Sequence, residues 1–411
     1  MLFFLFELRK LYYFCMMLTI SDRGQQMPAS PIRKLVPFAE KAKAKGITVY
    51  HLNIGQPDLA TPPSTIEAVQ KAKIDVLEYS HSAGNLSYRK KLVQYYKKLN
   101  IEVTPDDILV TTGGSEAILF AFFACLNPGD EVIVAEPFYA NYNGFACTAG
   151  VKIVPIKSVI ENGFALPPLE AFEQVITDKT KAIIYCNPNN PTGYLYSKEE
   201  IQTLGNICRK HGLYLFSDEA YREFSYTDEV YCSALHLEGL EDHVVVLDTI
   251  SKRYSACGAR IGAFVTKNKA LYDTAMKFAQ ARLSPPGLAQ ILAEAAVDLP
   301  DDFFDEHKAE YLKRRDTVVQ RLNKMEGVFC PTPGGAFYAV AKLPIDDCDK
   351  FCQWLLEDFS YQNQTLMLAP ATGFYNTPGL GKDEVRLAYV LNVEALNRAM
   401  DCLEEALKVY N

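Results

Sequence analysis

The sequence predicts an α/β protein with a doubly wound, mostly parallel sheet and a smaller α+β domain. Seven short apolar runs alternate with helical patterns, an order that is typical of strand-helix-strand units. Most of these runs lack polar alternation, as expected for strands buried on both faces of a parallel sheet. After about residue 296 long charged helices alternate with a few strands. The predicted strands of the sheet cover 108–112, 131–137, 151–156, 181–186, 213–218, 244–249 and 260–266.

This order of patterns divides the chain into an N-terminal extension (1–29), a large sheet domain (62–296) and a smaller domain built from 30–61 and 297–411. A serine cap at Ser30, followed by Pro31, predicts a helix over 30–46 that docks on the smaller domain. In the rest of the smaller domain we expect helices over 303–326, 349–360 and 393–410 and strands over 336–340, 366–369 and 384–390.

The first twenty residues are strongly apolar, but charges at Glu7, Arg9 and Lys10 interrupt them. The remaining apolar run is about half as long as a membrane-spanning helix requires. No small-residue cleavage site follows, which disfavours a secretory signal. We expect no stable membrane span and interpret the segment as an extension without function, with Met16, Met17 or Met27 as alternative starts. The open alternative is a segment that touches a membrane or binds a partner.

Charge and cysteine content exclude several classes of function. The 411 residues include 42 Lys and Arg against 50 Asp and Glu, a net charge of -8, so binding to nucleic acid or to an anionic membrane is disfavoured. The 11 cysteines and six histidines show no spacing typical of a metal centre. Scattered cysteines are in keeping with a reducing compartment, and we expect the protein to be cytoplasmic.

The candidate site follows from the residues that come directly after the predicted strands, because doubly wound sheets bind ligands beyond the carboxyl ends of their strands. Gly113, Gly114 and Ser115 follow the first strand and open a helix. Backbone N–H groups and the dipole at such a helix start attract phosphate. The spacing matches neither the dinucleotide-binding nor the P-loop motif, which favours a single small phosphate group over a nucleotide.

Other strand ends add an amide, a carboxylate, a phenol and two cationic groups. Asp218 ends a fully apolar strand, where a carboxylate is costly unless it meets a cation. Pyridoxal 5'-phosphate would use all these groups, since it has an aldehyde that reacts with lysine, a ring nitrogen, a ring oxygen and a phosphate. The candidate residues after the later strands are Asn187, Asp218, Tyr221, Lys252 and Arg260.

On these motifs the chain resembles the fold-type-I, class I/II aminotransferases, and in particular bacterial aspartate aminotransferases, from about Pro31 to the C-terminus. The likeness rests on motifs that occur in the family's order. They are Asn53-x-Gly55-x-Pro57-Asp58, the Tyr79 to Gly84 segment, Gly113-Gly114-Ser115, the turn from Asn187 to Gly193, Asp218-x-x-Tyr221, Ser251-Lys252 with Arg260, and Arg386.

The resemblance implies a role for each of these residues. Lys252 would form a Schiff base with the cofactor and act as general base, helped by a pKa lowered by charge and desolvation. Asp218 would pair with the ring nitrogen, and Tyr221 and Asn187 with the ring oxygen. Tyr139 would stack on the ring, and Tyr79 would reach the phosphate from a second subunit, which implies a homodimer with shared active sites. The phosphate would be held by Gly114, Ser115, Ser251 or Thr249, and Arg260, with Gly113 leaving room for the backbone.

Substrate recognition is also implied by the resemblance. Arg386 would clamp the α-carboxylate, helped by Gly55 and Asn187. Arg282 would bind a second carboxylate across the dimer interface, although a structural role for it is equally open. We therefore expect transfer of an amino group from an L-amino acid, with aspartate as the leading candidate, to a 2-oxo acid such as 2-oxoglutarate.

Three alternatives remain. The chain could be an aminotransferase for alanine or aromatic amino acids, or a lyase or 1-aminocyclopropane-1-carboxylate synthase on the same scaffold, which would share the cofactor residues. A transcriptional regulator that uses this domain as a sensor is disfavoured. About thirty residues precede the first predicted helix, and they are too few and too apolar for a DNA-binding module.

Overall fold

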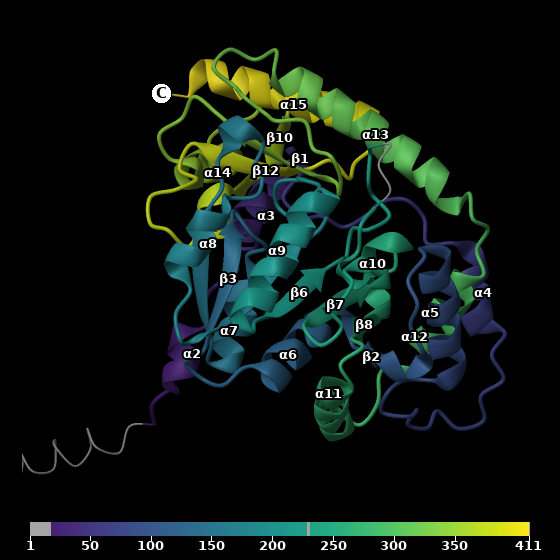
Figure 1. Cartoon of the computed structure of the whole chain (residues 1–411). Coiled ribbons are helices and arrows are strands. Elements are labelled where there is room, and N and C mark those ends of the chain that lie inside the picture. Colours follow the sequence, from purple (N-terminus) through teal and green to yellow (C-terminus); the bar gives the residue numbers. More distant parts are fainter. Residues whose placement is uncertain (1–17, 228–230, 411) are drawn as a thin grey trace, which may run out of the picture.

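The computed structural model describes residues 18–227 and 231–410 and confirms the α/β class (Figure 1). All seven apolar runs are strands of one sheet, in the order β2-β8-β7-β6-β5-β3-β4. The strands are β2 (Ile108–Thr111), β3 (Glu131–Glu136), β4 (Lys152–Lys157), β5 (Thr180–Cys186), β6 (Tyr214–Asp218), β7 (Val244–Thr249) and β8 (Gly262–Val265).

The sheet is mostly parallel, as predicted. Strands β4, β3, β5, β6 and β7 are parallel to one another, whereas β8 is antiparallel to both β7 and β2. The chain passes outward from β3 to β4 and then returns to β5 on the other side of β3. Ligands of such sheets bind at this reversal, beyond the carboxyl ends of the strands. The loops that follow β3, β5, β6 and β7 are therefore the part of the fold to search for a site.

Helices cover both faces of the sheet, which explains why its strands are apolar throughout. On one face α6 (Gly113–Cys125), α7 (Asn141–Ala149) and α11 (Lys269–Arg282) contribute to one apolar cluster with the strands. On the other face a second cluster includes residues of α5 (Leu86–Lys98), α9 (Lys198–His211) and α12 (Gly287–Val297). The shorter helices of this part are α4 (Pro63–Gln70), α8 (Leu169–Val175) and α10 (Ile250–Arg253).

The remaining elements form two small sheets and the long helices that we expect after residue 296; strand β1 was not predicted. Strands β1 (Thr48–His51) and β10 (Gln364–Met367) are parallel, and β11 (Ala369–Pro370), β12 (Glu384–Ala388) and β9 (Tyr338–Lys342) form an antiparallel sheet. Figure 1 shows α13 (Phe303–Leu322) and α15 (Val393–Val409) side by side along one edge, where they contact each other. Helix α14 (Cys348–Glu357) also belongs to this part of the chain.

The apolar core of this part also includes Cys186, Tyr221 and Phe224, which belong to the predicted large domain. The two parts therefore pack through a shared core next to the carboxyl ends of the main strands. The exact domain boundaries, and with them the extent of the 1–29 extension, stay predictions.

The predicted helix over 30–46 starts later than expected. Helix α3 spans Val36–Ala44, and residues 31–35 form turns before it. The physical reason is Pro37, which has no N–H to donate to the preceding turn and restricts the residue before it. The docking expectation is confirmed, since α3 contacts α14 and β1.

Of the apolar N-terminal segment, residues 1–17 lie outside the described residues, so the interpretation of that segment stays a prediction. The described part that follows contains a short helix, α2 (Asp22–Gln26), which the sequence did not predict. This helix contacts α7, where the Cys147 thiol donates to the carbonyl oxygen of Arg23 at 3.6 Å.

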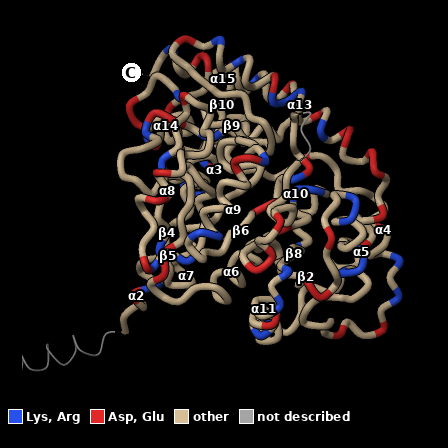
Figure 2. Tube along the Cα trace, in the orientation of Figure 1, with Lys and Arg blue, Asp and Glu red and all other residues tan. Residues whose placement is uncertain are grey.

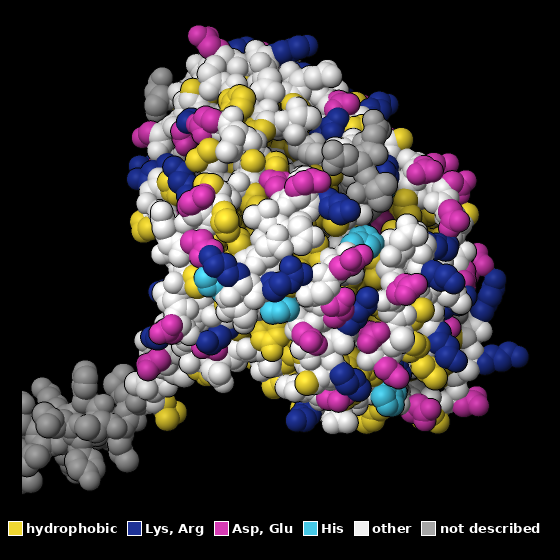
Figure 3. All heavy atoms as spheres, viewed as in Figure 1, with side chains coloured by type: hydrophobic (Ala, Val, Ile, Leu, Met, Phe, Trp, Pro, Cys, Tyr) yellow, Lys and Arg dark blue, Asp and Glu magenta, His cyan; other side chains and the backbone are white. Residues whose placement is uncertain are grey.

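Charged side chains of both signs are interspersed along the chain and on the face shown in space-filling view (Figures 2 and 3). Among residues 18–227 and 231–410, no helix is long and apolar enough to cross a membrane. Within the same described ranges, no group of three or more His, Cys, Asp or Glu is placed to hold a metal ion.

Candidate active site

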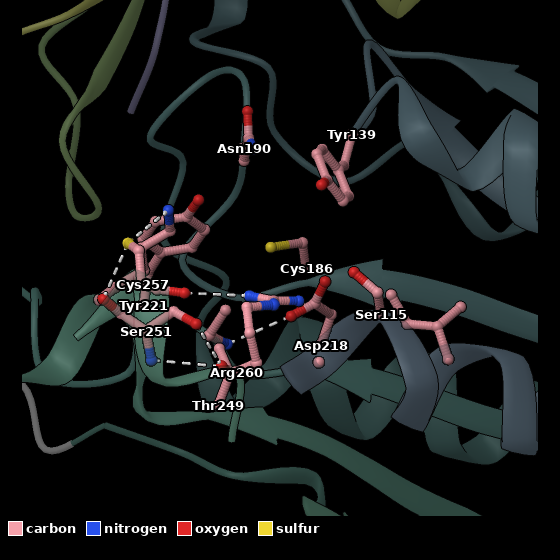
Figure 4. Close-up of a pocket in the computed structure, with 14 residues that line it drawn as sticks. Ser115, Tyr139, Cys186, Asn190, Asp218, Tyr221, Thr249, Ser251, Cys257 and Arg260 are labelled. Carbon is pink, nitrogen blue, oxygen red and sulfur yellow. Dashed lines mark hydrogen bonds between the residues drawn. The ribbon is translucent and has the colours of Figure 1, made fainter. Parts of the chain in front are cut away.

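A cavity of about 130 Å³ lies at the carboxyl ends of the main strands, at the position that the strand order indicates (Figure 4). Residues that follow β2, β3, β5, β6 and β7 meet there, although these segments are far apart in the sequence. The lining includes Gly114, Ser115, Tyr139, Cys186, Asn190, Asp218, Tyr221, Thr249, Ser251, Lys252, Cys257 and Arg260.

One end of the cavity is rich in hydrogen-bond donors. Gly113 begins α6 at φ 74°, and a Cβ atom there would lie 2.4 Å from Nη2 of Arg260, so the guanidinium approaches the turn because residue 113 is glycine. The hydroxyls of Thr249 and Ser251 are 2.8 Å apart. Figure 4 shows Arg260 beside Thr249 and Ser251. Together with the N-terminus of α6, these groups can bind a phosphate-sized anion.

Asp218 is a buried carboxyl group without a cationic partner. Its Oδ2 accepts a hydrogen bond from the Tyr142 hydroxyl at 2.9 Å, and its Oδ1 accepts from the Ala220 N–H at 3.2 Å. No Lys or Arg of the described residues forms an ion pair with it. Burial raises the pKa of Asp218 to about 6. A ligand that brings a positively charged N–H group would remove this cost.

Lys252 places its amine in the same cavity. Its Nζ donates to the carbonyl oxygen of Gly55 at 2.7 Å and to the Cys257 sulfur at 3.6 Å. Burial lowers the pKa of Lys252, and the positive charges of Arg386 and Arg260 add to this effect. A lysine with a lowered pKa was expected at this position, and such an amine has a larger neutral fraction for nucleophilic or basic chemistry.

Arg386 lies beside the cavity, in the middle of β12, and is 1% exposed. Its Nη1 donates to Oδ1 of Asn190 at 3.1 Å, and its Nη2 donates to the carbonyl oxygen of Asn53. Its Nε has no partner, and none of the described acidic residues forms an ion pair with it. Burial lowers the pKa of Arg386. A buried guanidinium without a counter-ion is well suited to bind a carboxylate ligand.

The two asparagines of the turn that follows β5 lie differently with respect to the cavity. Asn187 does not line the cavity, and its Oδ1 accepts a hydrogen bond from the Tyr196 N–H at 3.0 Å, within the turn. Asn190, three residues later, lines the cavity and contacts Arg386. The sequence could not distinguish the two, because both are asparagines that precede a proline in one short motif.

The tyrosines that the sequence predicts at the site occupy different environments. Tyr139 lines the cavity, and its hydroxyl accepts from Nδ2 of Asn141 at 2.8 Å. Tyr221 is buried, and its hydroxyl shares a 2.8 Å hydrogen bond with that of Tyr338. Tyr79 is 76% exposed and does not line the cavity of its own chain.

Arg282 does not join the other candidate residues in the cavity of its own chain. Its Nη1 pairs with Glu116 at 3.3 Å, and its Nη2 donates to the carbonyl oxygen of Ser82 at 3.0 Å. The guanidinium thus already has an acidic partner, which favours a structural role within this chain.

Besides Asn190, four residues at or near the cavity were not predicted from the sequence. Cys186 ends β5 directly before the recognised turn, and Cys257 lies within the segment between Lys252 and Arg260, so their positions next to motifs were an available signal. Tyr142 supports Asp218 from α7. Tyr338 comes from β9, where nothing in the local sequence indicates a site.

Comparisons with known proteins agree with this geometry. The profile of the aminotransferase class I and II family matches residues 47–399. An aspartate aminotransferase from Thermotoga maritima is 34% identical, with 92% of this chain and 97% of that protein covered. One from Pyrococcus horikoshii is 31% identical, with 95% and 97% covered. Among solved structures, an alanine aminotransferase from Pyrococcus furiosus has a TM-score of 0.87 at 31% identity, covering 95% of this chain and 100% of that chain.

Proposed function

Because this chain belongs to the aminotransferase class I and II family and is an aminotransferase, we propose that it holds pyridoxal 5'-phosphate and transfers the amino group of an L-amino acid, aspartate first, to a 2-oxo acid such as 2-oxoglutarate. The observation that carries the proposal is the buried, uncompensated guanidinium of Arg386 next to the low-pKa amine of Lys252. An amino acid needs both groups, one for its carboxylate and one for proton transfer.

The residues of the cavity fit this cofactor. When bound, pyridoxal phosphate supplies an aldehyde carbon and a protonated ring that withdraws electrons from the substrate Cα. The lone carboxyl of Asp218 matches the ring nitrogen, because a pyridinium N–H would be the cation that this buried group lacks. The Gly113-Gly114-Ser115 turn, the Thr249 and Ser251 hydroxyls and Arg260 match the phosphate.

Further contacts would orient the ring. The Tyr221 hydroxyl and the Asn190 amide both lie at the cavity and would bind the ring oxygen, with Asn190 taking the role that the resemblance assigned to Asn187. Tyr139, also in the lining, would stack on the ring. These groups come from separate strand ends, so the sheet fixes their spacing before the cofactor binds.

Lys252 would move the proton. The Gly55 carbonyl and the Cys257 thiol hold its Nζ in the cavity. Because its pKa is lowered, Nζ can take a proton from the substrate Cα and return it to the cofactor side. Arg386 would hold the substrate carboxylate, so that the Cα proton lies within reach of this one amine.

The amino donor is less constrained than the cofactor. The names of the relatives favour aspartate. Arg282 already pairs with Glu116 in its own chain, and this ion pair, together with the likeness to the Pyrococcus furiosus alanine enzyme, makes alanine the second candidate. A lyase or 1-aminocyclopropane-1-carboxylate synthase would be revealed by its products.

We also propose a homodimer with shared active sites, in the cytoplasm. Support for the dimer comes from Tyr79, which is exposed next to other exposed apolar side chains of its segment, Val76 and Leu77. The segment packs against the loop after α11, where Ser82 donates to the carbonyl oxygen of Leu283. Exposed apolar surface of this kind is typical of an interface. The ten described cysteines are all free, in keeping with a reducing compartment.

The deciding experiment is a donor screen on purified protein with added cofactor. Half-reaction rates with aspartate, glutamate, alanine and phenylalanine are compared, and the 2-oxo acid product is identified. Fast conversion of aspartate to oxaloacetate supports the proposal, and a preference for alanine supports the second candidate. Elimination or ring-closure products in place of a 2-oxo acid would overturn both.

A further inference from the structure

Tyr338 contacts the proposed functional residues Arg386 and Tyr221, although it belongs to neither of their sequence motifs. It begins β9, opposite Ala388 of β12, so it lies diagonally across the antiparallel pair from Arg386 on the same face. The guanidinium carbon of Arg386 is 4.6 Å from the centre of the Tyr338 ring. Phe374 provides a second ring at 4.8 Å. Two aromatic rings and two neutral hydrogen-bond acceptors thus contact the arginine. Because none of these groups carries a negative charge, the guanidinium can still pair with an anion.

The hydroxyl of Tyr338 faces the other part of the molecule. It lies 2.8 Å from the hydroxyl of Tyr221, and the two rings are edge to face. Both residues are buried, so the hydrogen bond is shielded from water. A phenol that accepts a hydrogen bond becomes a better donor through its own proton. The state of the Tyr338 hydroxyl therefore affects how strongly Tyr221 can donate to a ligand.

The Tyr338 hydroxyl also lies against the backbone of Gly55. A Cβ atom on Gly55 would lie 1.8 Å from it, so the backbone at residue 55 packs directly against Tyr338. That backbone carries the carbonyl oxygen to which Lys252 donates. One side chain thus touches Arg386, Tyr221 and Gly55. These three residues lie far apart in the sequence, so no local pattern could reveal the contact.

We propose that Tyr338 is a positioning residue that couples carboxylate binding at Arg386 to the hydrogen bond that Tyr221 donates to the cofactor. Its ring orients the guanidinium, and its hydroxyl donates to the Tyr221 oxygen and strengthens the Tyr221 proton as a donor. This inference rests on the proposed function, since it assumes that Tyr221 faces the ring oxygen of pyridoxal phosphate.

The hydroxyl is tested with Tyr338→Phe, which keeps the ring and removes only the oxygen. The readout is the absorbance of the holoenzyme as a function of pH, which reports the protonation of the cofactor bound at Lys252. With a weaker donor at Tyr221, the ring oxygen holds its negative charge less well, and we expect the midpoint to rise by about 0.5 pH unit. Tyr50→Phe is the matched control, because the Tyr50 hydroxyl also forms a side-chain hydrogen bond, donated to Gln364 at 2.8 Å, and Tyr50 does not line the cavity.

The ring is tested by the affinity for maleate, a dicarboxylate that cannot react. We expect Tyr338→Phe to bind maleate within about twofold of the native protein and Tyr338→Leu to bind about three- to tenfold more weakly, because only leucine removes the aromatic face under Arg386. Tyr338→Met keeps a long side chain and replaces the leucine variant if that variant does not fold.

The outcomes separate the two proposals. A native protein that shows no absorbance band with pyridoxal phosphate overturns the proposed function and this inference with it. A native band with a pH midpoint that is the same in Tyr338→Phe, Tyr50→Phe and the native protein overturns the inference alone. A shifted midpoint in Tyr338→Phe, with no shift in Tyr50→Phe, supports it.

Discussion

The hydroxyl of Tyr142 donates a 2.9 Å hydrogen bond to Oδ2 of Asp218, although the two residues come from α7 and from the end of β6. This bond stabilises the charged form of the carboxyl, but burial is the larger effect and keeps the pKa raised to about 6. The site therefore keeps a carboxyl group in a costly position, in the place where the proposed cofactor would bring a cation.

The first prediction concerns the stability of the apoprotein. The folded pKa of Asp218, about 6, is above its ordinary value of 3.8, so the folded state binds the proton more tightly. The free energy of unfolding should then fall by up to about 3 kcal/mol as the pH rises from below about 4 to above about 6. Urea unfolding at several pH values, compared between the native protein and Asp218→Asn, isolates this contribution. Parallel pH profiles for the two proteins would contradict it.

The second prediction concerns activity at the same residue. Asp218→Asn keeps the size of the side chain but cannot hold a positively charged ring nitrogen. We expect kcat to fall by about 10²- to 10⁴-fold, the usual range for a lost proton-transfer or charge-stabilising group. Steady-state rates with saturating cofactor measure this. Near-native kcat would show that Asp218 does not face the ring nitrogen.

The next prediction is that replacing Arg386 lowers activity but hardly changes stability. In Arg386→Met the protein loses two hydrogen bonds but also an uncompensated buried charge, and these effects offset each other. We expect the free energy of unfolding of the apoprotein to change by less than about 1 kcal/mol, while kcat/KM falls by about 10²-fold or more. If stability and activity fall together, Arg386 is a structural residue.

For Arg282 we expect the opposite result, a loss of stability without a change in the preference among amino donors. Arg282→Ala leaves Glu116 and the Ser82 carbonyl without their partner, and we expect a loss of about 1–3 kcal/mol in stability. The rates with aspartate, glutamate, alanine and phenylalanine should change by the same factor. A loss confined to the two acidic donors would instead assign Arg282 to the second carboxylate, as the resemblance first suggested.

The two asparagines of the turn after β5 give a matched pair of variants. Asn190→Ala removes the acceptor that contacts Arg386 and should raise the KM for the amino donor about tenfold. Asn187→Ala removes an acceptor for the Tyr196 N–H and should lower the melting temperature by a few degrees with a smaller effect on KM. Michaelis constants and thermal unfolding of both variants decide between these roles. Larger effects of Asn187→Ala on KM would restore the original assignment.

The sheet could be predicted from the sequence because its strands are buried on both faces, which gives continuous apolar runs such as Val244–Thr249. Residues that directly follow these strands, including Asp218 and Lys252, could be predicted for the same reason. The start of α3 was wrong by several residues because Pro37 outweighs the cap at Ser30.

The other features of the site could not be predicted, because they depend on contacts that only the folded chain forms. Whether Asn187 or Asn190 points into the cavity is decided by the path of one turn. The partner of Arg282 is decided by how α11 lies against α6. Tyr338 reaches Tyr221 across a distance of 117 positions in the chain, and its own strand is an ordinary apolar one.

The central claim, that Lys252 holds pyridoxal phosphate in this cavity, is tested most directly by borohydride reduction of the protein with the cofactor, followed by peptide mass spectrometry. We predict a yellow protein that becomes irreversibly labelled at Lys252, with no label at that peptide in Lys252→Ala. A protein that stays colourless with added pyridoxal phosphate, or that is labelled only at other lysines, would contradict the claim.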